Sequence, residues 1–486
     1  MPGTVGQGVS LRLTAVRSMG GGDMIIREPT VGPIIGWTTV SSARLWARGE
    51  QRCDTRTFGA ARIRKSGDMR YGEAKVFKMM PSFDFTAIVD FADLEVNQSY
   101  DYQIGYFFAD GEPGDIEITE SDNWHEAARG TFKTVASKSA GETSFVFGSC
   151  RYLLRLFGGT LFDGRGDKTF RSIDRQIEAG HAIDLLLMVG DQIYADDLNV
   201  FGPDRSLDEF FSRYRKVFGQ PHIRKLMGRV PTYMTLDDHE ISNDWSQDQV
   251  KKNADLFAAA IHAYQCYQFV HGPGFRYSGR PDYSDTPQKL WYEFRHGNSA
   301  FFVMDTRTER HPSFSPPEMI GETQMDALLD WLTAPAHKPA NKFVVTSVPF
   351  FPDTRSGSSD KWSGFKRQRL QILDHIRKNK IAKVVFLAGD VHCSMAGQLT
   401  YKGDRSFRVT SVISSSFYWP YPQGQASGFQ RSGHLDVGED QNYKLSGFEE
   451  VHSDDNFARL TTVGGKLKAE FFERKGAALG THTLTL

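Results

Sequence analysis

Four apolar segments of this chain are each followed at once by side chains that could bind a metal ion. The segment 185–189 is an unbroken apolar run that leads into Asp191, with Tyr194 three residues further on. Such a run is typical of a strand buried on both faces, and open α/β sheets place their sites at the C-terminal ends of these strands. Three other segments end in Cys150, in the acidic stretch 237–240, and in the pair Asp390 and His392.

The donor types predict the chemistry. Carboxylate and phenol oxygens suit hard metal ions, whereas thiolate and imidazole add affinity for softer ones, so ferric iron or zinc is favoured at one position. A second position with only oxygen donors would suit calcium, magnesium or manganese. Two ions bridged by one carboxylate, for which Asp191 is the natural choice, form a clamp for in-line hydrolysis of a phosphoester.

Separate structural explanations exist for single members of this set. Asp191 could cap a helix, Tyr194 could simply be packed, and His392 alone would normally be a core histidine. The recurrence of one design at four strand ends favours a shared site. Several carboxylates and a Cys150 thiolate at one rim would also repel strongly unless a cation neutralised them.

The segments around these ends predict a large α/β domain behind a smaller β domain. Residues 31–134 alternate in hydrophobicity and carry frequent turn residues, which predicts an antiparallel sandwich. After a polar linker at 136–142, strands alternate with helical segments at 167–179, 207–218, 254–271, 323–333 and 365–378. We therefore expect an irregular lead-in at 1–30, a β-sandwich domain at 31–138 and a catalytic domain at 143–486.

Composition excludes several classes of protein. The 486 residues carry a net charge of -1, which does not indicate a nucleic-acid partner. The four cysteines are scattered, so neither a disulfide framework nor a CxxC zinc site is expected. No signal peptide, twin-arginine motif or long apolar run is seen, so we expect a cytoplasmic protein without a membrane span. Phosphate-loop, dinucleotide and serine-hydrolase motifs are absent, and the oligomeric state is not indicated.

The motifs together resemble those of a known superfamily. The segments 190–194 (Gly-Asp-x-x-Tyr), 237–240 (Asp-Asp-His-Glu) and 389–392 (Gly-Asp-Val-His) resemble the calcineurin-like metallophosphatases. They are most similar to the PhoD-type alkaline phosphatases, whose first motif is Ser-Cys, as at 149–150. The segments 31–46, 305–307 and 414–417 resemble the same family, so the resemblance covers most of the chain from about residue 30.

This resemblance implies a fold of the α+β or α/β class. It would be a four-layer metallophosphatase sandwich of two mixed β-sheets flanked by helices, preceded by an N-terminal antiparallel β-sandwich like a fibronectin or immunoglobulin module. The implied function is metal-dependent hydrolysis of phosphomonoesters or phosphodiesters by a metal-bound water or hydroxide, with a small phosphoester as substrate. The alternative is a non-catalytic binding protein on a degenerate metallophosphatase scaffold.

The resemblance also implies two metal positions. Fe(III) would be held by Cys150, Asp191, Tyr194 and His392, and Ca(II) by Asp191, Asp238 and Asp390. Zinc, manganese or magnesium are the alternatives. Asn243 would reach the second ion or the phosphate. Relatives often carry a histidine where this chain has Ser347, which leaves the second position with oxygen donors only, as calcium prefers.

Three further residues are implied to act on the substrate. His239 would orient the phosphate or protonate the leaving group. Arg307 and Arg151 are candidate phosphate clamps, because a guanidinium group matches phosphate oxygens. A surface ion pair is the alternative for either arginine.

Overall fold

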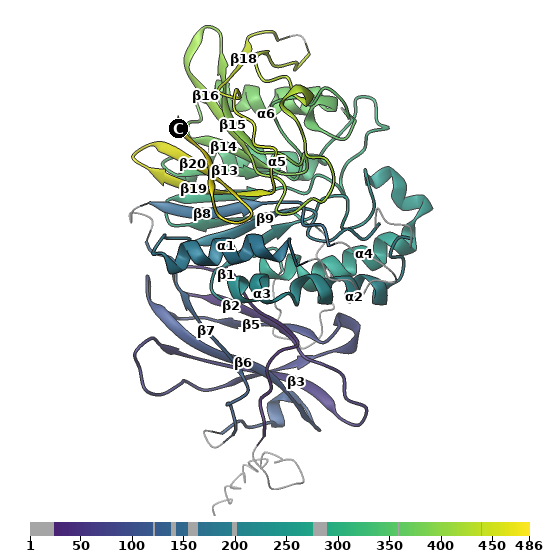
Figure 1. Ribbon diagram of the computed structural model, residues 1–486, viewed down its shortest axis with the longest axis vertical. Coiled ribbons are helices and arrows are strands. Elements are labelled where there is room, and N and C mark those ends of the chain that lie inside the picture. The colour runs from purple at the N-terminus through teal and green to yellow at the C-terminus, as the bar shows by residue number, and fades with distance from the viewer. Residues whose placement is uncertain are drawn as a thin grey trace, which may run out of the picture.

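The computed structural model describes residues 24–119, 122–137, 142–153, 164–196, 202–275, 289–357, 359–438 and 440–486. Two large mixed β-sheets lie against each other, helices cover the outer face of each, and two smaller antiparallel sheets precede them (Figure 1). The predicted four-layer sandwich behind an N-terminal antiparallel β region is therefore confirmed. None of the helices in these residues combines the length and apolar character needed to cross a membrane.

The N-terminal region consists of two antiparallel sheets. One contains β1 (Val31–Thr38), β2 (Ala43–Arg48) and β5 (Thr86–Phe91), and the other contains β4 (Lys75–Met79), β3 (Arg56–Lys65), β6 (Ser99–Ala109) and β7 (Ala128–Lys133). Tyr100 accepts a hydrogen bond from the Glu95 amide at 2.9 Å, as expected of a corner tyrosine. Residues 1–23 of the expected lead-in and 138–141 of the expected linker lie outside the described residues, so these boundaries stay predictions.

The six-stranded sheet carries the first half of the site. Its order is β10 (Thr232–Thr235), β9 (Leu185–Val189), β8 (Thr143–Gly148), β19 (Asn456–Val463), β20 (Lys466–Glu473) and β21 (Ala478–Thr485), with β8, β9 and β10 parallel. The helices α1 (Asp167–Glu178), α2 (Leu207–Phe218), α3 (Pro221–Met227) and α4 (Ala254–Tyr267) lie between this sheet and the N-terminal sheets (Figure 1).

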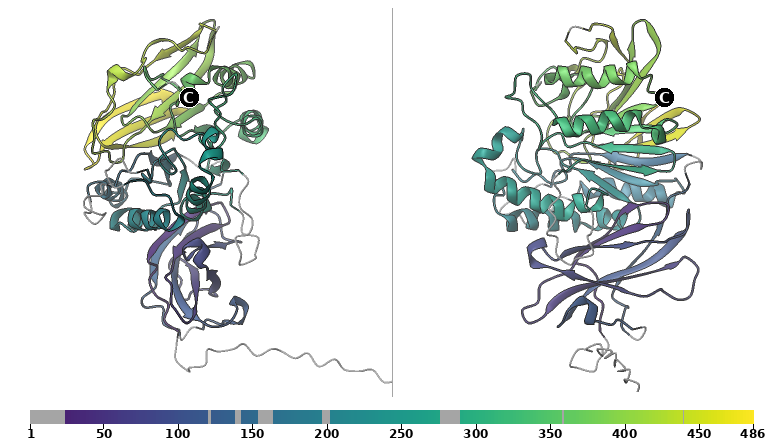
Figure 2. Two further views of the ribbon diagram at one scale, coloured as in Figure 1. Left: turned by 90° about the vertical axis from the view of Figure 1, so that its right-hand side faces the viewer. Right: turned by 180° about the vertical axis from the view of Figure 1, so that it is seen from behind.

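The eight-stranded sheet carries the second half. Its order is β11 (Tyr292–His296), β12 (Ser299–Val303), β13 (Asn341–Val345), β14 (Val384–Ala388), β16 (Asp404–Ile413), β15 (Met395–Tyr401), β18 (Tyr443–Ser446) and β17 (Gly433–His434). The helices α5 (Glu322–Thr333) and α6 (Lys366–Lys378) cover its outer face (Figure 2). Phe145 of β8 packs edge-on against Phe301 and Phe343, with ring centroids 5.4 and 5.1 Å apart, so the two sheets share one core.

Short 3-10 helices account for much of the remaining regular backbone. They are η1 (Pro81–Phe83), η2 (Pro113–Asp115), η3 (Gln247–Lys252), η4 (Phe269–His271), η5 (Pro335–His337), η6 (Trp362–Gly364) and η7 (Ala426–Gly428). The helix predicted at 254–271 breaks at Gln268, where α4 gives way to η4. At this break the Gln268 side chain donates a hydrogen bond to the Glu240 carboxylate at 3.0 Å.

Candidate metal centre

The C-terminal ends of parallel strands from both sheets converge on one place. β8 ends just before Cys150, β9 just before Asp191, and β14 just before Asp390. Backbone hydrogen bonds tie the first two ends together, because the Cys150 amide donates to Gly190 at 3.1 Å and the Arg151 amide donates to Asp191 at 2.7 Å. Residues far apart in sequence are thus delivered side by side.

A buried thiol and a buried phenol lie against the Asp191 carboxylate. Cys150 Sγ and Tyr194 Oη are each 3.4 Å from Asp191 Oδ2. All three residues are at most 2% exposed. They are three of the four ligands predicted for the first metal position, and the structure brings them together.

His392, the fourth predicted ligand, joins this group through two neighbours. Its ring stacks on Trp419 at 3.9 Å, and Trp419 in turn packs 5.4 Å from Tyr194. The Ser415 hydroxyl accepts a hydrogen bond from the His392 amide at 3.0 Å and contacts Cys150 Sγ at 3.2 Å. Ser415 therefore links the last ligand-bearing loop to the first, a role that no sequence motif indicated.

The second group of donors is made of carboxylates. Oxygen atoms of Asp237, Asp238 and Asp390 lie within 4.8 Å of one another, and one ligand atom each from Asp191, Asp238 and His239 forms a second group of the same size. Asp238 belongs to both groups. It therefore lies between two sets of donors, as the sequence analysis expected of Asp191. Asp237 belongs to the acidic stretch 237–240 that the sequence analysis singled out, but it was assigned to neither metal position.

The backbone at these residues is held in an uncommon conformation. Cys150, Asp191, Asp390 and His392 all have positive φ angles, of 56°, 55°, 72° and 51°. For residues other than glycine this left-handed conformation costs of order 1–3 kcal/mol each and persists where the surrounding structure enforces it, which is common at functional sites. Four of the seven residues predicted to bind metal therefore have a backbone conformation that the surrounding structure imposes.

Glu240 holds part of this backbone in place through hydrogen bonds. Its fully buried carboxylate accepts hydrogen bonds from the amides of Asp191, Gln192 and Asp237 at 3.0, 2.7 and 2.8 Å, and from the Gln268 side chain at 3.0 Å. One side chain thereby fixes the loops after β9 and β10. The sequence contained Glu240 in its acidic motif but gave no sign of this bracing role.

The electrostatics of the group favour a bound cation. Burial raises the pKa of the Cys150 thiol well above its ordinary value of 9.0, and the Asp191 and Asp390 carboxylates raise it further. Burial, Cys150 and Asp191 raise the pKa of Tyr194 in the same way. A metal ion reverses such shifts, because its charge stabilises thiolate and phenolate.

Two further observations fit a metal. Burial lowers the pKa of His392 to about 3, so its imidazole is neutral, which is the form that binds metals. Asp237 Oδ2 is buried and has no hydrogen-bond partner within the described ranges. Buried anionic oxygens are normally paired, so the donor set fits a cation.

His239 is anchored beside the carboxylates. Its Nδ1 lies 2.8 and 2.9 Å from the two carboxylate oxygens of Asp196, and its ring packs 4.4 Å from Tyr194. Asp196 also accepts a hydrogen bond from the Asn243 amide at 2.7 Å. The Asn243 side chain is exposed at the rim, so its contact with a metal or phosphate stays a prediction.

Arg307 lies at the site, but its guanidinium is buried among carboxylates. It donates to Asp237 and Asp360, and its Nη2 is 3.4 Å from Asp238 Oδ1. The side chain has no exposed surface. Arg307 therefore neutralises the acidic group in this structure, and its role as a phosphate clamp stays a prediction. Ser347 belongs to the same network, because its hydroxyl donates to Asp237 at 2.7 Å.

Lys361 is a second protein cation at this group. Its Nζ is 2.5 Å from Asp390 Oδ2 and also contacts Asp360, and the side chain is 14% exposed. Lys361 and Asp360 come from the loop before η6 and follow no strand end, so the sequence pattern gave no reason to select them. The Lys361 ammonium therefore already lies against Asp390, one of the three carboxylates of the second donor group.

Arg151 points away from the site. Its Nη1 donates to the Val217 carbonyl at 2.8 Å, its Nη2 bonds to Gln220, and its guanidinium lies 4.8 Å from the centre of the Phe170 ring. Only 2% of the residue is exposed. The predicted phosphate clamp is thereby corrected, because these contacts hold the Arg151 guanidinium among the helices, away from the group around Cys150. Arg151 instead ties α1, α2 and α3 together.

Comparison with known proteins places the chain among phosphatases. Residues 156–446, more than half of the chain, match the family described as PhoD-like phosphatase. Alkaline phosphatase D of Bacillus subtilis (strain 168) is 24% identical in an alignment 351 residues long, which covers 63% of this chain but only 57% of that protein.

Solved structures share the fold. The structure of PhoD matches with a TM-score of 0.68 at 19% identity, covering 94% of this chain and 88% of that one. Purple acid phosphatase from yellow lupin (Lupinus luteus) seeds matches with a TM-score of 0.58 at 13% identity, covering 93% of this chain and 74% of that one. These likenesses show the fold. The family match over more than half of the chain shows that it belongs to the PhoD-like phosphatase family.

Proposed function

We propose that this protein is a metal-dependent phosphoester hydrolase that acts on phosphomonoesters, phosphodiesters or both. Family membership supports the reaction class, as does the likeness to a protein named alkaline phosphatase D. The observation that carries the proposal is the gathering of Cys150 and Tyr194 around Asp191, with His392 held beside them. Such a mixture of buried donors has a chemical use only around a cation.

The donors suggest which ions are bound. Cys150, Asp191, Tyr194 and His392 would hold Fe(III), because thiolate, phenolate, carboxylate and imidazole together suit this ion. The carboxylates of Asp191, Asp238 and Asp390 would hold Ca(II), with zinc, manganese or magnesium as alternatives. When bound, the ions would activate water and stabilise negative charge on the phosphoryl group.

His239 is the residue best placed to move a proton. Its Nδ1 is engaged by Asp196, which fixes the ring and leaves Nε2 as the atom for substrate. A proton on Nε2 would pass to the leaving-group oxygen, so that the alcohol departs neutral. Asp196 acts through His239 and is therefore a positioning residue.

Metal removal tests the proposal directly. The chelated protein should not hydrolyse p-nitrophenyl phosphate or bis-p-nitrophenyl phosphate, and addition of Fe(III) with Ca(II) should restore turnover. Phenolate bound to ferric iron should also colour the protein. Full activity after complete metal removal would contradict the proposal. If the metal-loaded protein turned over neither ester, the non-catalytic alternative would be favoured. A colourless, fully active zinc form would contradict the iron assignment but not the proposed hydrolysis.

A further inference from the structure

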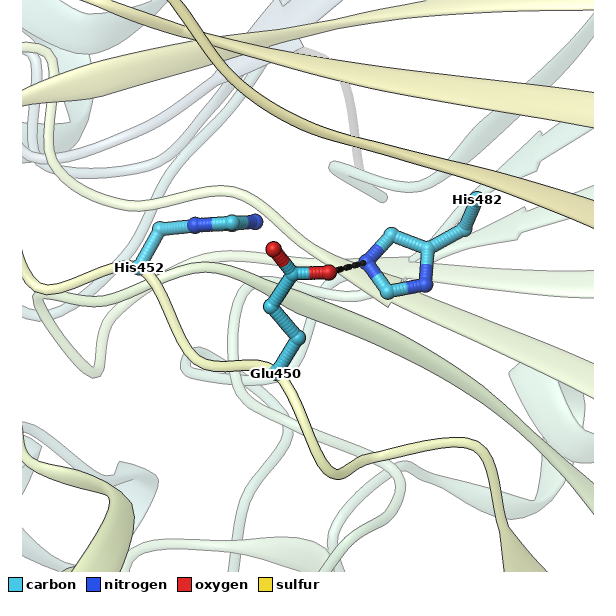
Figure 3. A group of neighbouring side chains, drawn as sticks. All are labelled: Glu450, His452 and His482. Carbon is cyan, nitrogen blue, oxygen red and sulfur yellow. Dashed lines mark ion pairs between the residues drawn. The ribbon is translucent and has the colours of Figure 1, made fainter.

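A second group of metal-binding side chains lies outside the candidate centre. Glu450 and His452 belong to the segment between β18 and β19, and His482 lies on β21. One ligand atom from each lies within 4.8 Å of the others. Figure 3 shows the two imidazole rings on either side of the Glu450 carboxylate, one facing each of its oxygens. We propose that these three residues bind a divalent transition-metal ion of the zinc type.

The imidazole nitrogens that face the group lack ordinary partners. His452 is only 7% exposed, and its Nε2 is buried without a hydrogen-bond partner within the residues that the structure describes. His482 Nε2 is also buried and makes no hydrogen bond there, although it lies 3.4 Å from Glu450 Oε2. Buried ring nitrogens are normally satisfied, so two orphaned ones aimed at one carboxylate indicate a missing ligand.

The spacing of one pair of these ligands suits a shared ion. Two ligands bound at about 2.1 Å to a tetrahedral zinc ion lie about 3.4 Å apart. The distance between His482 Nε2 and Glu450 Oε2 has this value. The same distance without hydrogen-bond geometry is a poor contact between an imidazole and a carboxylate alone.

Gly480 keeps this space open. A Cβ atom at this position would lie 2.8 Å from His452 Nε2 and 2.9 Å from Glu450 Oε1. Gly480 and His482 are two residues apart on β21, so both face the group. A side chain larger than glycine would therefore fill the gap between two of the three ligands.

The ligand types select the class of metal. Two imidazoles and one carboxylate suit zinc and its transition-metal neighbours better than calcium or magnesium, which prefer oxygen. Packing of the His452 ring on Phe471, with centroids 5.0 Å apart, fixes its orientation. Glu450 is half exposed, which leaves a route for the ion from solvent.

A bound ion would join parts of the chain that are otherwise held mainly by strand pairing. β21 is the edge strand of its sheet. The His452 backbone exchanges two hydrogen bonds of 2.8 Å with Ser394, which lies two residues after His392. The ion would therefore fasten the edge strand to a segment that supports the candidate centre, as a structural site distinct from it.

Zinc stoichiometry in the full-length protein tests the proposal. After chelation and reloading with Zn²⁺, His482→Gln and Gly480→Ala should each bind one ion fewer than the wild type by mass spectrometry. The exposed His434 on β17 offers the matched control, since His434→Gln should keep the full count. Asp191→Asn should change metal at the candidate centre and keep the ion at His482, which separates the two sites.

Cobalt provides a second measurement. Co²⁺ at a tetrahedral site has visible bands, and the share of the spectrum due to this site should be absent from His482→Gln. His452 is buried, so its variants could fail to fold, and His482→Gln is the deciding one. An unchanged zinc count together with an unchanged cobalt spectrum in folded His482→Gln would overturn the proposal, whether or not the protein hydrolyses phosphoesters.

Discussion

Replacing Lys361 should tighten the binding of the ion proposed for the second position. The Lys361 ammonium is 2.5 Å from Asp390 Oδ2, so an incoming cation must displace it from this carboxylate. In Lys361→Met the stem is retained and the competing charge is lost. Asp360 keeps its contacts with Arg307 and Arg310. Asp390 Oδ1 keeps Arg307 Nη2 at 3.9 Å, so the substitution isolates neither carboxylate.

The size of the effect follows from the contact that the ion breaks. Lys361 and Asp390 are 14% and 12% exposed, so solvent screens their interaction little. An ion pair between charged groups that are this little exposed contributes about 1.5–3 kcal/mol, as other charge-assisted contacts do. At about 1.4 kcal/mol per factor of ten, its removal should lower the half-saturating Ca²⁺ concentration by about 10- to 150-fold.

The assay is hydrolysis of a chromogenic phosphoester by iron-loaded protein, titrated with Ca²⁺ at constant ionic strength. Lys361→Arg retains the charge and should stay near the wild-type value. The matched control is Lys366→Met, because Lys366 is also 2.5 Å from a carboxylate, that of Asp436, but both groups are about half exposed. Such a surface pair should leave the titration unchanged. A half-saturating concentration in Lys361→Met that equals or exceeds the wild-type value would refute the reasoning.

Three other substitutions test the remaining assignments. Tyr194→Phe should abolish the visible absorption of the iron-loaded protein, and retained colour would exclude phenolate as the ligand. His239→Gln should reduce kcat by about 10²–10⁴-fold, the usual contribution of a proton-transfer residue; an unchanged kcat would remove it from that role. Arg44→Ala should lower the free energy of unfolding by about 3 kcal/mol or more in urea titrations, because the buried Arg44 donates to three backbone carbonyls and to Asp90. The exposed Arg56, paired with Glu112, is the control, and Arg56→Ala should cost less than about 1 kcal/mol; equal losses would contradict the argument.

The sequence predicted the part of the site that strands deliver. The strand at 185–189 was predicted with the bounds it has, and Asp191 follows it at the rim. Cys150 and Asp390 also follow apolar strands closely, and this pattern can be recognised in the sequence alone. The helix at 207–218 was likewise predicted in full, since its apolar residues recur at helical spacing.

Residues that act through tertiary contacts escaped this reasoning. Lys361 comes from a loop, and its contact with Asp390 depends on how that loop folds over the sheet. The direction of Arg151 could not be deduced from its place beside Cys150. His452 and His482 are thirty positions apart and meet only because β19, β20 and β21 form a meander. No spacing rule links residues whose distance is set by two hairpins.

Different kinds of groups surround the two metal positions that we propose. Neutral hydrogen bonds and packing surround the first: the Ser415 hydroxyl contacts Cys150, and Trp419 stacks on His392. Charged groups surround the second, where Arg307 and Lys361 face the carboxylates of Asp238 and Asp390.

Uncharged contacts do not compete with a cation, whereas an ammonium and a guanidinium do. We therefore expect the first proposed position to keep its ion and the second to exchange it. We expect a chelator to remove the second ion before the first, so that activity falls while the colour of the iron site persists. Simultaneous loss of colour and activity at every chelator concentration would mean that protein cations do not set the affinity of the second position.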